Sequence, residues 1–360
     1  MLRGSVEKSD ILVVGAGPVG LYLAGLLEKS GRTVRLLEEH GEIGRPGHCS
    51  GLVSRNLDLL IRPRKEWVEH EVSGSVIRAG SSSIRLTKGR TAARVIDRSR
   101  FDASLKEGLE SEIVLGARAE RLHAGNSGVS VKTSKGVFKA DMLLGCDGAS
   151  SAVARHFGSR PRRLLMGVIG ITRQENHSKN VEITIDKARS RDGFFWKIPR
   201  GRTTEYGLFG SMAGSRQSRL QSGIDFLELE GFFRIKPVER KAGLIPLGPG
   251  KTYFPRTLLV GDAAGMSKPW SGGGLVYGLT AARIAANVIE QAFQEGDFSE
   301  GFLARYEKGW KKAFGNQLHA GMLGRGIFEN LGDFEIRMAL RGMRIFSPLL
   351  NGLDMDFLVR

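Results

Sequence analysis

Short apolar runs and a glycine-rich turn alternate at the start of the chain. Residues 11–14, ILVV, form an apolar run typical of a buried parallel strand, and they lead directly into GAGPVG at residues 15–20. A leucine-rich stretch with helical spacing follows and ends near Gly31, and a second apolar run at residues 34–37 ends on Glu38. This order predicts a strand, a tight turn, a helix and a second strand parallel to the first.

The rest of the chain shows two kinds of pattern. Residues 67–91 alternate apolar and polar positions, and residues 167–210 contain several short strand-like segments. Both predict strands of a separate antiparallel sheet. Helical spacing predicts a short helix at residues 52–60, an amphipathic helix at 218–230 and a long helix at 275–294. We therefore predict an α/β fold with three parts. These are an α/β domain of residues 1–66, 92–160 and 241–300, an antiparallel-sheet domain of residues 67–91 and 161–240, and a helical C-terminal region of residues 301–360.

Composition adds a few limits to this picture. Glycine supplies 49 of 360 residues, about twice the usual ~7%, so many loops must turn sharply or approach something closely. The two cysteines, Cys49 and Cys146, lie far apart without metal-ligand spacing, which predicts no metal site and a reducing, cytoplasmic location. No apolar run approaches the ~20 residues of a membrane span. The net charge of +16 fits an anionic lipid, nucleic-acid or acidic protein partner, and equally a solvated basic surface.

The first glycine turn has the residue types that a dinucleotide requires. Gly15 permits the tight turn, Gly17 has no side chain to hold a pyrophosphate away, and Gly20 lets the helix pack closely on the strand. Free N–H groups at the helix start would face the phosphates. Glu38, about twenty residues further on, would accept hydrogen bonds from ribose hydroxyls and would disfavour a 2′-phosphate. The turn therefore predicts bound FAD or NAD, the alternative being a glycine turn without a ligand.

Two later segments repeat the sequence of a strand end, an acid and a glycine. The apolar run at residues 141–146 leads into Asp147-Gly148, and the run at 258–260 leads into Gly261-Asp262 and then a glycine run before the long helix. An aspartate at a strand end can accept from a ribityl hydroxyl, and a helix N-terminus can stabilise phosphate or a reduced flavin. Three such turns in one chain predict a single flavin site.

These segments resemble a known superfamily. GAGPVG, VIDRSRFDASL, GCDGASSAVARHF and VGDAAG, in this order, are similar to the FAD-binding signature of the flavoprotein monooxygenase superfamily. Within it, the chain most resembles the geranylgeranyl reductase family, which includes archaeal digeranylgeranylglycerophospholipid reductases. GRPGHCSG resembles that family's cysteine loop beside the flavin, with Ser50 in place of the usual glycine. FFWKIP resembles its Tyr-x-Trp-x-Phe-Pro motif, with Phe194 and Ile198 as the departures.

The resemblance covers residues 11–290 and implies an FAD-binding, Rossmann-like three-layer domain of the p-hydroxybenzoate hydroxylase type. Besides the three glycines of the first turn, it implies a set of residues in contact with FAD. These are Val19, Glu38, Cys49, Ser50, Arg98, Ala119, Asp262, Gly274 and Leu275. Arg98 also has a chemical reason, because a guanidinium can bridge pyrophosphate and ribityl oxygens; the alternative is a surface salt bridge.

The implied reaction is reduction of an isoprenoid double bond. Reduced FAD would deliver a hydride from N5 to one carbon, and a proton would reach the other. Such an alkene carries no activating group, so the site must supply shape and dryness, and Phe194, Trp196, Pro269 and Trp270 are the candidate walls. Cys49 is the candidate proton relay; the competing interpretation is a plain van der Waals contact with the flavin ring.

The resemblance also implies partners. An isoprenoid lipid would be the substrate, and a transiently docking ferredoxin, NAD(P)H or deazaflavin would supply electrons, because no second glycine fingerprint is present. The basic, apolar tail predicts peripheral association with a membrane. The main rival is a flavin monooxygenase or halogenase acting on an aromatic or polyene substrate. A quinone-reducing flavoprotein with an iron–sulfur cluster does not fit two distant cysteines, and the motifs of a nucleic-acid binder are absent.

Overall fold

The computed structural model describes residues 8–211, 237–345 and 356, so the amphipathic helix predicted at 218–230 lies outside the described residues. One layer is an eight-stranded sheet. Its strands are β1 (Ser9–Val14), β2 (Val34–Glu38), β8 (Glu112–Leu115), β9 (Ala119–Gly125), β10 (Gly128–Thr133), β11 (Gly136–Gly145), β17 (Tyr253–Phe254) and β18 (Thr257–Leu259). The order β18–β11–β1–β2–β8 is parallel throughout, and β9 and β10 continue from β11 as an antiparallel meander.

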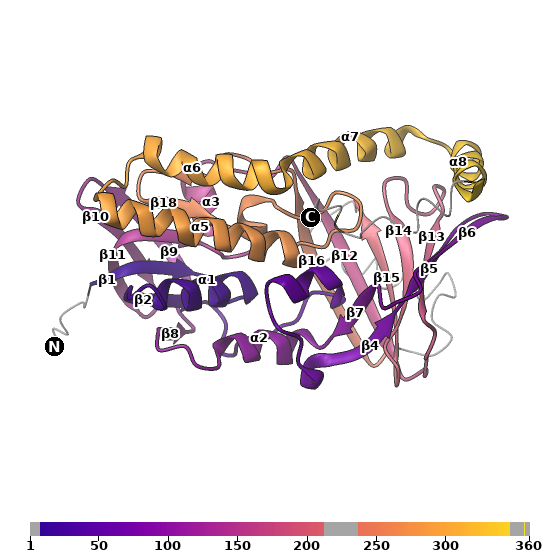
Figure 1. Ribbon diagram of the computed structural model, residues 1–360, viewed down its shortest axis with the longest axis horizontal. Helices are drawn as coiled ribbons and strands as arrows, with labels where there is room; N and C mark the ends of the chain where they lie inside the picture. Colours follow the sequence, from indigo (N-terminus) through magenta and orange to yellow (C-terminus); the bar gives the residue numbers. More distant parts are fainter. Residues whose placement is uncertain (1–7, 212–236, 346–355, 357–360) are drawn as a thin grey trace.

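This parallel sheet is covered on both faces. Ile11, Leu12 and Val13 in β1 are fully buried although successive side chains of a strand point to opposite faces. On one face α1 (Pro18–Glu28) packs against α5 (Leu275–Glu295), and α5 packs against α6 (Glu300–Trp310), as Figure 1 shows. Apolar runs without alternation were the signal for this arrangement, and the prediction of an α/β domain built on a parallel sheet is confirmed.

A second, seven-stranded sheet lies beside the first (Figure 1), in the order β16–β12–β15–β14–β13–β5–β6. Its strands are β5 (Gly74–Ala79), β6 (Ser82–Thr87), β12 (Arg163–Thr172), β13 (Asn180–Ile185), β14 (Phe194–Pro199), β15 (Thr204–Gly210) and β16 (Glu239–Leu247). All neighbouring pairs are antiparallel except β13 and β5, which are parallel. The predicted separate sheet is therefore present, with one parallel pair that local alternation could not reveal.

A small third sheet contains β3 (Leu52–Ser54), β7 (Ala93–Ile96) and β4 (Val68–Val72) in that order. The helix predicted at residues 52–60 is wrong for its first part: residues 52–54 pair with β7, and a short 3₁₀ helix, Arg55–Leu59, follows. The interpretation of residues 67–91 as strands of one sheet is also corrected, since β4 pairs with β7 whereas β5 and β6 join the seven-stranded sheet. Strand pairing across long sequence distances decided both outcomes.

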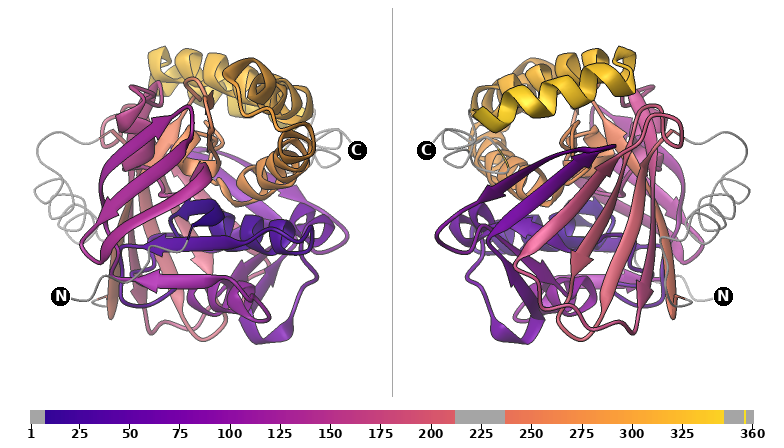
Figure 2. Two further views of the ribbon diagram at one scale, coloured as in Figure 1. Left: turned by 90° about the vertical axis from the view of Figure 1, so that its left-hand side faces the viewer. Right: turned by 90° about the vertical axis from the view of Figure 1, so that its right-hand side faces the viewer.

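The C-terminal helices connect the two larger sheets. After α6 the chain continues through a π-helical turn, Lys311–Gly315, into α7 (Asn316–Asn330), which runs towards the seven-stranded sheet and ends beside α8 (Asp333–Ile345). Ile336 and Leu340 of α8 are buried against Ala79 and Ile84 of β5 and β6. Figure 2 shows α8 lying across the end of this sheet. Other short elements are α2 (Arg98–Lys106), α3 (Ala152–His156), and 3₁₀ turns at Lys65–Trp67 and Gly261–Ala264.

Candidate functional site

The first glycine turn forms an open cradle at the start of α1. Gly15 has φ +98°, and a Cβ there would lie 2.4 Å from the carbonyl oxygen of Cys146. A Cβ on Gly20 would lie 2.0 Å from the Gly15 carbonyl oxygen, so this glycine lets α1 begin directly on the turn. By contrast, a Cβ on Gly17 would have no described atom within 4 Å. Among described residues no side chain caps the N-terminus of α1, which leaves space and backbone donors for a phosphate.

Glu38 ends β2 beside this turn and is buried. Its carboxylate accepts hydrogen bonds from the backbone N–H of Ala16 at 2.8 Å and of His40 at 2.9 Å, and it pairs with His40 Nδ1 at 2.7 Å. The Glu38 carbonyl oxygen accepts from the N–H of Ala117 at 2.7 Å, so Ala119, at the start of β9, lies two residues from this contact. Glu38, the first glycine turn and Ala119, one of the implied FAD contacts, thus lie near one another at this edge of the sheet.

The third glycine turn meets the first one in space. A Cβ on Gly261, whose φ is +69°, would lie 3.0 Å from a methyl group of Val19. A Cβ on Gly278 in α5 would lie 2.7 Å from the same side chain. The side chain of Val19 therefore packs into the space that Gly261 and Gly278, late in the sequence, leave open. Since Gly15 touches Cys146 and Val19 touches Gly261, the three turns converge at the carboxyl edge of the parallel sheet.

Asp262 lies in the 3₁₀ turn Gly261–Ala264 and contacts the residues just before α5. Its carboxylate accepts a hydrogen bond from the Ser267 hydroxyl at 2.9 Å, and a Cβ on Gly274 would lie only 2.6 Å from its Oδ1. Leu275 is the first residue of α5, and among described residues no side chain caps this helix. Burial raises the pKa of Asp262, and the positive charge of Arg98 partly opposes that rise. The structure therefore brings together the predicted aspartate, the glycine run and the helix start.

Arg98 begins α2 and reaches the same region. Its guanidinium forms a two-pronged ion pair with Asp102, both contacts being 3.1 Å, and Cys49 lies close enough to favour its charge. Burial alone would lower the pKa of Arg98, but Asp102 and Cys49 outweigh it, so this pKa is raised and the charge is retained. Arg98 is thus a largely buried ion-pair partner of Asp102, and its charge acts on both Cys49 and Asp262.

The cysteine loop, residues 44–51, is held by β7 on one side and by Arg200 on the other. The side chain of Cys49 is exposed, and its sulfur accepts from the N–H of Gly51 at 3.4 Å. Gly51 has φ +73°, and a Cβ there would lie 2.1 Å from the Ile96 carbonyl oxygen, so only glycine fits against β7. The carbonyl oxygen of Ser50 accepts from Arg200 Nη1 at 2.7 Å. Cys146, in contrast, is buried, and burial raises the pKa of its thiol, which agrees with a core role.

An aromatic wall covers one face of the seven-stranded sheet. The ring of Phe194 lies 6.1 Å from that of Trp196 and 5.3 Å from that of Phe209. The indole of Trp196 lies over Gly207 of β15, where an added Cβ would be 2.1 Å from the ring. Met322 of α7 packs against this wall from the opposite side. The two predicted residues of the FFWKIP segment, Phe194 and Trp196, therefore share one apolar cluster.

Pro269 and Trp270 lie at the edge of this apolar cluster, under α7. Pro269 packs against Gly321, and the exposed Trp270 contacts Gly324 and the ring of Phe328, with centroids 5.9 Å apart. The glycine run, residues 272–274, brings the third glycine turn next to this cluster. A Cβ on Gly272 would lie 3.2 Å from the Phe209 ring. Trp270 is thus closer to the surface than Phe194 and Trp196, at the outer end of the apolar space.

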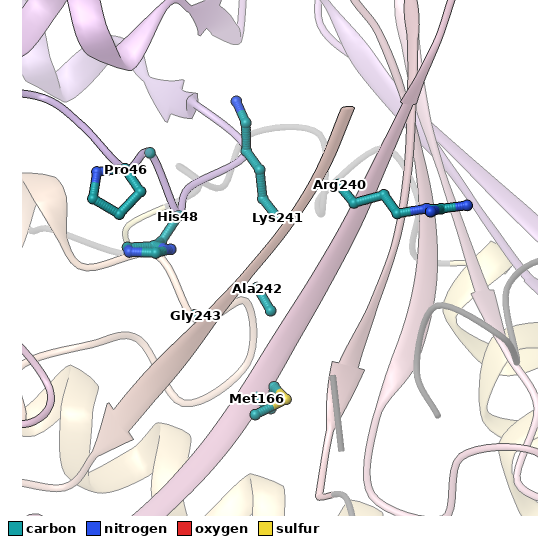
Figure 3. Close-up of a pocket in the computed structure, with 8 residues that line it drawn as sticks. Pro46, His48, Met166, Arg240, Lys241, Ala242 and Gly243 are labelled. Atoms are coloured by element: carbon teal, nitrogen blue, oxygen red, sulfur yellow. The ribbon is translucent and has the colours of Figure 1, made fainter. Parts of the chain in front are cut away.

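A pocket of about 240 Å³ opens behind the cysteine loop, between residues 46–48 and β16 (Figure 3). His48 packs on Gly243, whose added Cβ would lie 3.0 Å from the His48 side chain. Lys241 and Arg240 point to opposite sides of the strand (Figure 3). The residues around this opening are therefore basic on both sides of the strand.

Sequence reasoning did not single out several charged groups near the site. Arg325 of α7 is buried, donates to the Pro269 carbonyl oxygen at 3.0 Å and lies 4.9 Å above the Phe209 ring. Asp147, in contrast, was named from the sequence as a strand-end acceptor; its carboxylate accepts from the N–H groups of Ala152 at 2.6 Å and Val153 at 3.1 Å and so caps its own helix. The signal for Arg325 was weak, because the surrounding residues 323–327, LGRGI, do not show which face of α7 is buried.

Glu205 and Arg200 were also missed. Glu205 is fully buried in β15 and Arg200 lies in the turn before it. Here a signal existed: alternation along β15 places Glu205 on the same face as Gly207 and Phe209, an unusual position for a carboxylate.

Comparison with known proteins identifies the family of the chain. Residues 8–219 match a family described as FAD binding domain. A digeranylgeranylglycerophospholipid reductase 2 of Methanopyrus kandleri is 31% identical, the match covering 98% of this chain and 92% of that protein. A digeranylgeranylglycerophospholipid reductase of Methanococcus vannielii is 28% identical, with 93% and 90% covered.

Solved structures show the same fold. A geranylgeranyl bacteriochlorophyll reductase-like protein from Thermoplasma acidophilum superposes with a TM-score of 0.84 at 21% identity, covering 98% of this chain and 94% of that one. The flavin-dependent halogenase CmlS superposes with a TM-score of 0.70 at 16% identity, covering 95% and 72%. The chain belongs to the FAD binding domain family and to the family of the digeranylgeranylglycerophospholipid reductases.

Proposed function

We propose that this protein is an FAD-dependent reductase that saturates geranylgeranyl double bonds of a glycerophospholipid or a prenyl precursor. The relatives carry this activity in their names and match nearly the whole chain. The observation that carries the proposal is the junction at Gly272, where the glycine run of the cofactor turns touches Ile245 and Phe209 of the apolar wall. We infer that a chamber along this wall, next to the flavin site, takes the isoprenoid chain.

The residues present fit FAD. Gly17 leaves a cradle that any side chain would fill, and α1 and α5 both begin, among described residues, without a capping side chain. When bound, FAD would supply a hydride to one carbon of the double bond. The proposed FAD contacts from the chain are Gly15, Gly17, Val19, Gly20, Glu38, Cys49, Ser50, Arg98, Ala119, Asp262, Gly274 and Leu275.

The chamber would orient the alkene and exclude water. Phe194, Trp196, Pro269 and Trp270 are the proposed substrate contacts, and Met322 closes the space from α7. Because the double bond has no electron-withdrawing substituent, its position relative to the flavin and the absence of water matter more than acid strength. Arg325 would keep α7 over the chamber through its hydrogen bond to Pro269.

The second carbon needs a proton, and Cys49 is the proposed relay. Its sulfur is exposed and lies beside Arg98. A relay predicts that Cys49→Ala lowers kcat at least tenfold while lipid binding persists. Unchanged turnover in this variant would support the simpler interpretation, a van der Waals contact with the flavin ring.

The surface of α7 and α8 supports peripheral membrane association. Leu323 and Ile327 of α7 and Phe334 and Met338 of α8 are exposed, each pair being four residues apart on one helix face. The chain carries a net charge of +16, which would favour an anionic lipid surface. Trp270 lies beside α7, so a lipid tail would enter the chamber close to this face. Within the described residues, no helix has the length and hydropathy to cross a bilayer.

Electrons would come from a donor that docks transiently, such as a ferredoxin, NAD(P)H or a reduced deazaflavin. Mixing each donor anaerobically with the oxidised holoprotein, and following loss of the flavin's visible absorbance, identifies it. A donor that reduces the flavin no faster than buffer alone would be rejected.

The decisive experiment is anaerobic. Geranylgeranyl lipids are incubated with dithionite-reduced enzyme, and products are analysed by mass spectrometry. A reductase adds two hydrogens per double bond without oxygen. A monooxygenase or halogenase is the rival, because CmlS shares the fold; it would leave the lipid unchanged without oxygen, and that result would overturn the proposal.

A further inference from the structure

A buried carboxylate connects the aromatic wall to the cysteine loop. Glu205 in β15 has no exposed surface, and its Oε1 accepts a hydrogen bond from the indole N–H of Trp196 at 2.8 Å. Its Oε2 accepts from Arg200 Nη1 at 2.8 Å. Both oxygens are therefore engaged, one by the proposed substrate wall and one by a cation.

Arg200 carries the connection to the cysteine loop. The same Nη1 that binds Glu205 also donates to the carbonyl oxygen of Ser50 at 2.7 Å, next to Cys49. Its second terminal nitrogen, Nη2, forms an ion pair with Glu69 of β4. A continuous path thus runs from the Trp196 indole through Glu205 and Arg200 to the main chain of the cysteine loop.

The loop has little freedom on its opposite side. Gly51 lies so close to β7 that no side chain fits, and its N–H binds the Cys49 sulfur. Arg200 is therefore the contact that fixes the Ser50 peptide from the side of the seven-stranded sheet. A change in the charge of Glu205 alters the hydrogen bonds of both Trp196 and Arg200 at once.

We propose that Glu205 is a positioning residue whose ionised carboxylate sets the Trp196 indole and, through Arg200, the cysteine loop in a fixed relative arrangement. This inference rests on the proposed function, because it gives Glu205 the task of aligning that site's substrate wall with its flavin-side loop. No contact between Glu205 and the substrate is required.

Glu205 is poised to change charge near neutral pH. Burial raises its pKa to about 7, although Arg200, the Trp196 hydrogen bond and Lys241 of β16 all favour the ionised form. The other charged groups facing this cluster are Glu69, paired with Arg200, and Glu239, paired with Lys241 at 2.9 Å. Once Glu205 is protonated, the Arg200 contact becomes an ordinary hydrogen bond and Trp196 loses a charged acceptor.

The test follows Trp196 and Cys49 separately as the pH changes. In the holoprotein, the difference in indole emission between wild type and Trp196→Phe reports Trp196 across pH 5.5–8.5. Because Cys146 is buried, reaction with a thiol reagent reports Cys49. We expect the Trp196 signal of wild type to change with a midpoint near 7, and the Cys49 labelling rate to show an inflection at the same pH. Glu205→Gln should abolish both transitions.

Glu69→Gln is the matched control, since Glu69 binds Arg200 whereas, within the described residues, Trp196 donates its indole hydrogen bond to Glu205. It should keep the Trp196 transition. A wild-type Trp196 signal without a transition between pH 5.5 and 8.5 overturns the inference even if no variant folds, and so does an unchanged midpoint in Glu205→Gln. Failure of lipid reduction with an intact, Glu205-dependent transition would instead count against the proposed function alone.

Discussion

Replacing Gly17 by alanine tests whether the open space at the first turn is there for the cofactor. Gly17 has φ −73° and ψ 179°, an extended conformation that alanine adopts without strain. Its added methyl group would meet no described atom within 4 Å. The substitution therefore changes the shape of the cradle and leaves protein contacts as they are.

The magnitudes separate folding from binding. Reduced freedom of the unfolded chain would stabilise the variant by about 0.4–1 kcal/mol, whereas alanine is a poorer N-cap than glycine by up to about 1 kcal/mol. These effects nearly cancel, so the unfolding free energy of the apoprotein should stay within about 1 kcal/mol of wild type. A methyl group forced against the pyrophosphate should cost about 1–3 kcal/mol, as overpacking does. That cost corresponds to roughly 5- to 150-fold weaker FAD binding.

Two measurements check this expectation. FAD is titrated into deflavinated protein, and the dissociation constant is obtained from quenching of flavin fluorescence; urea unfolding of the apoprotein gives stability. Gly326→Ala is the matched control. Its added Cβ also meets no described atom within 4 Å, but Gly326 lies inside α7 and not at the first glycine turn. It should bind FAD like wild type and gain about 0.5–1 kcal/mol of stability. FAD binding by Gly17→Ala within twofold of wild type would refute the assignment of the cradle.

Three further predictions concern the wall, the membrane face and pH. Gly207→Ala places a methyl group 2.1 Å from the Trp196 ring, so the indole must shift: lipid reduction should fall more than tenfold and stability by about 1–3 kcal/mol, with FAD stoichiometry unchanged by absorbance. The double variant Phe334→Ser, Met338→Ser should pellet with anionic vesicles less than half as well as wild type; if wild type ignores such vesicles at both low and high salt, the membrane face is wrong. Glu205 keeps its proton in the folded state between its ordinary pKa of 4.5 and about 7, so the unfolding free energy should fall as pH rises through that window, by on the order of 3 kcal/mol. Urea unfolding at pH 5 and 8 measures this, and a Gln substitution that leaves the difference unchanged would contradict it.

The parts of the site that could be read from the sequence are governed by local backbone geometry. The tight turn at Gly15 and the close contact at Gly20 depend on residues a few positions apart, so the GAGPVG spacing was sufficient to predict them. The long helix α5 was likewise predicted nearly to its ends. The assignment of individual residues to FAD and lipid remains a prediction, since it concerns molecules that bind to this framework.

Errors arose where a segment's structure depends on a distant partner. Residues 52–54 have helix-compatible spacing but form a strand because β7 offers them hydrogen bonds. The nine residues of β16, ERKAGLIPL, show no alternation and gave no strand signal, yet they pair with residues 163–171 of β12. Propensity is weak compared with such pairing, which is why it was overruled at residues 52–54.

The amino-acid sequence by itself determined the class of fold, the three cofactor turns and the family, because these depend on short segments whose geometry is set by glycine and by apolar runs. Only the tertiary structure decided that Glu205 joins Trp196 to Arg200, and that Asp356 near the C-terminus accepts from Lys268 at 2.6 Å beside the glycine run. Buried charges must find partners wherever the fold brings them, and those partners are separated by up to hundreds of residues. No local pattern contains that information.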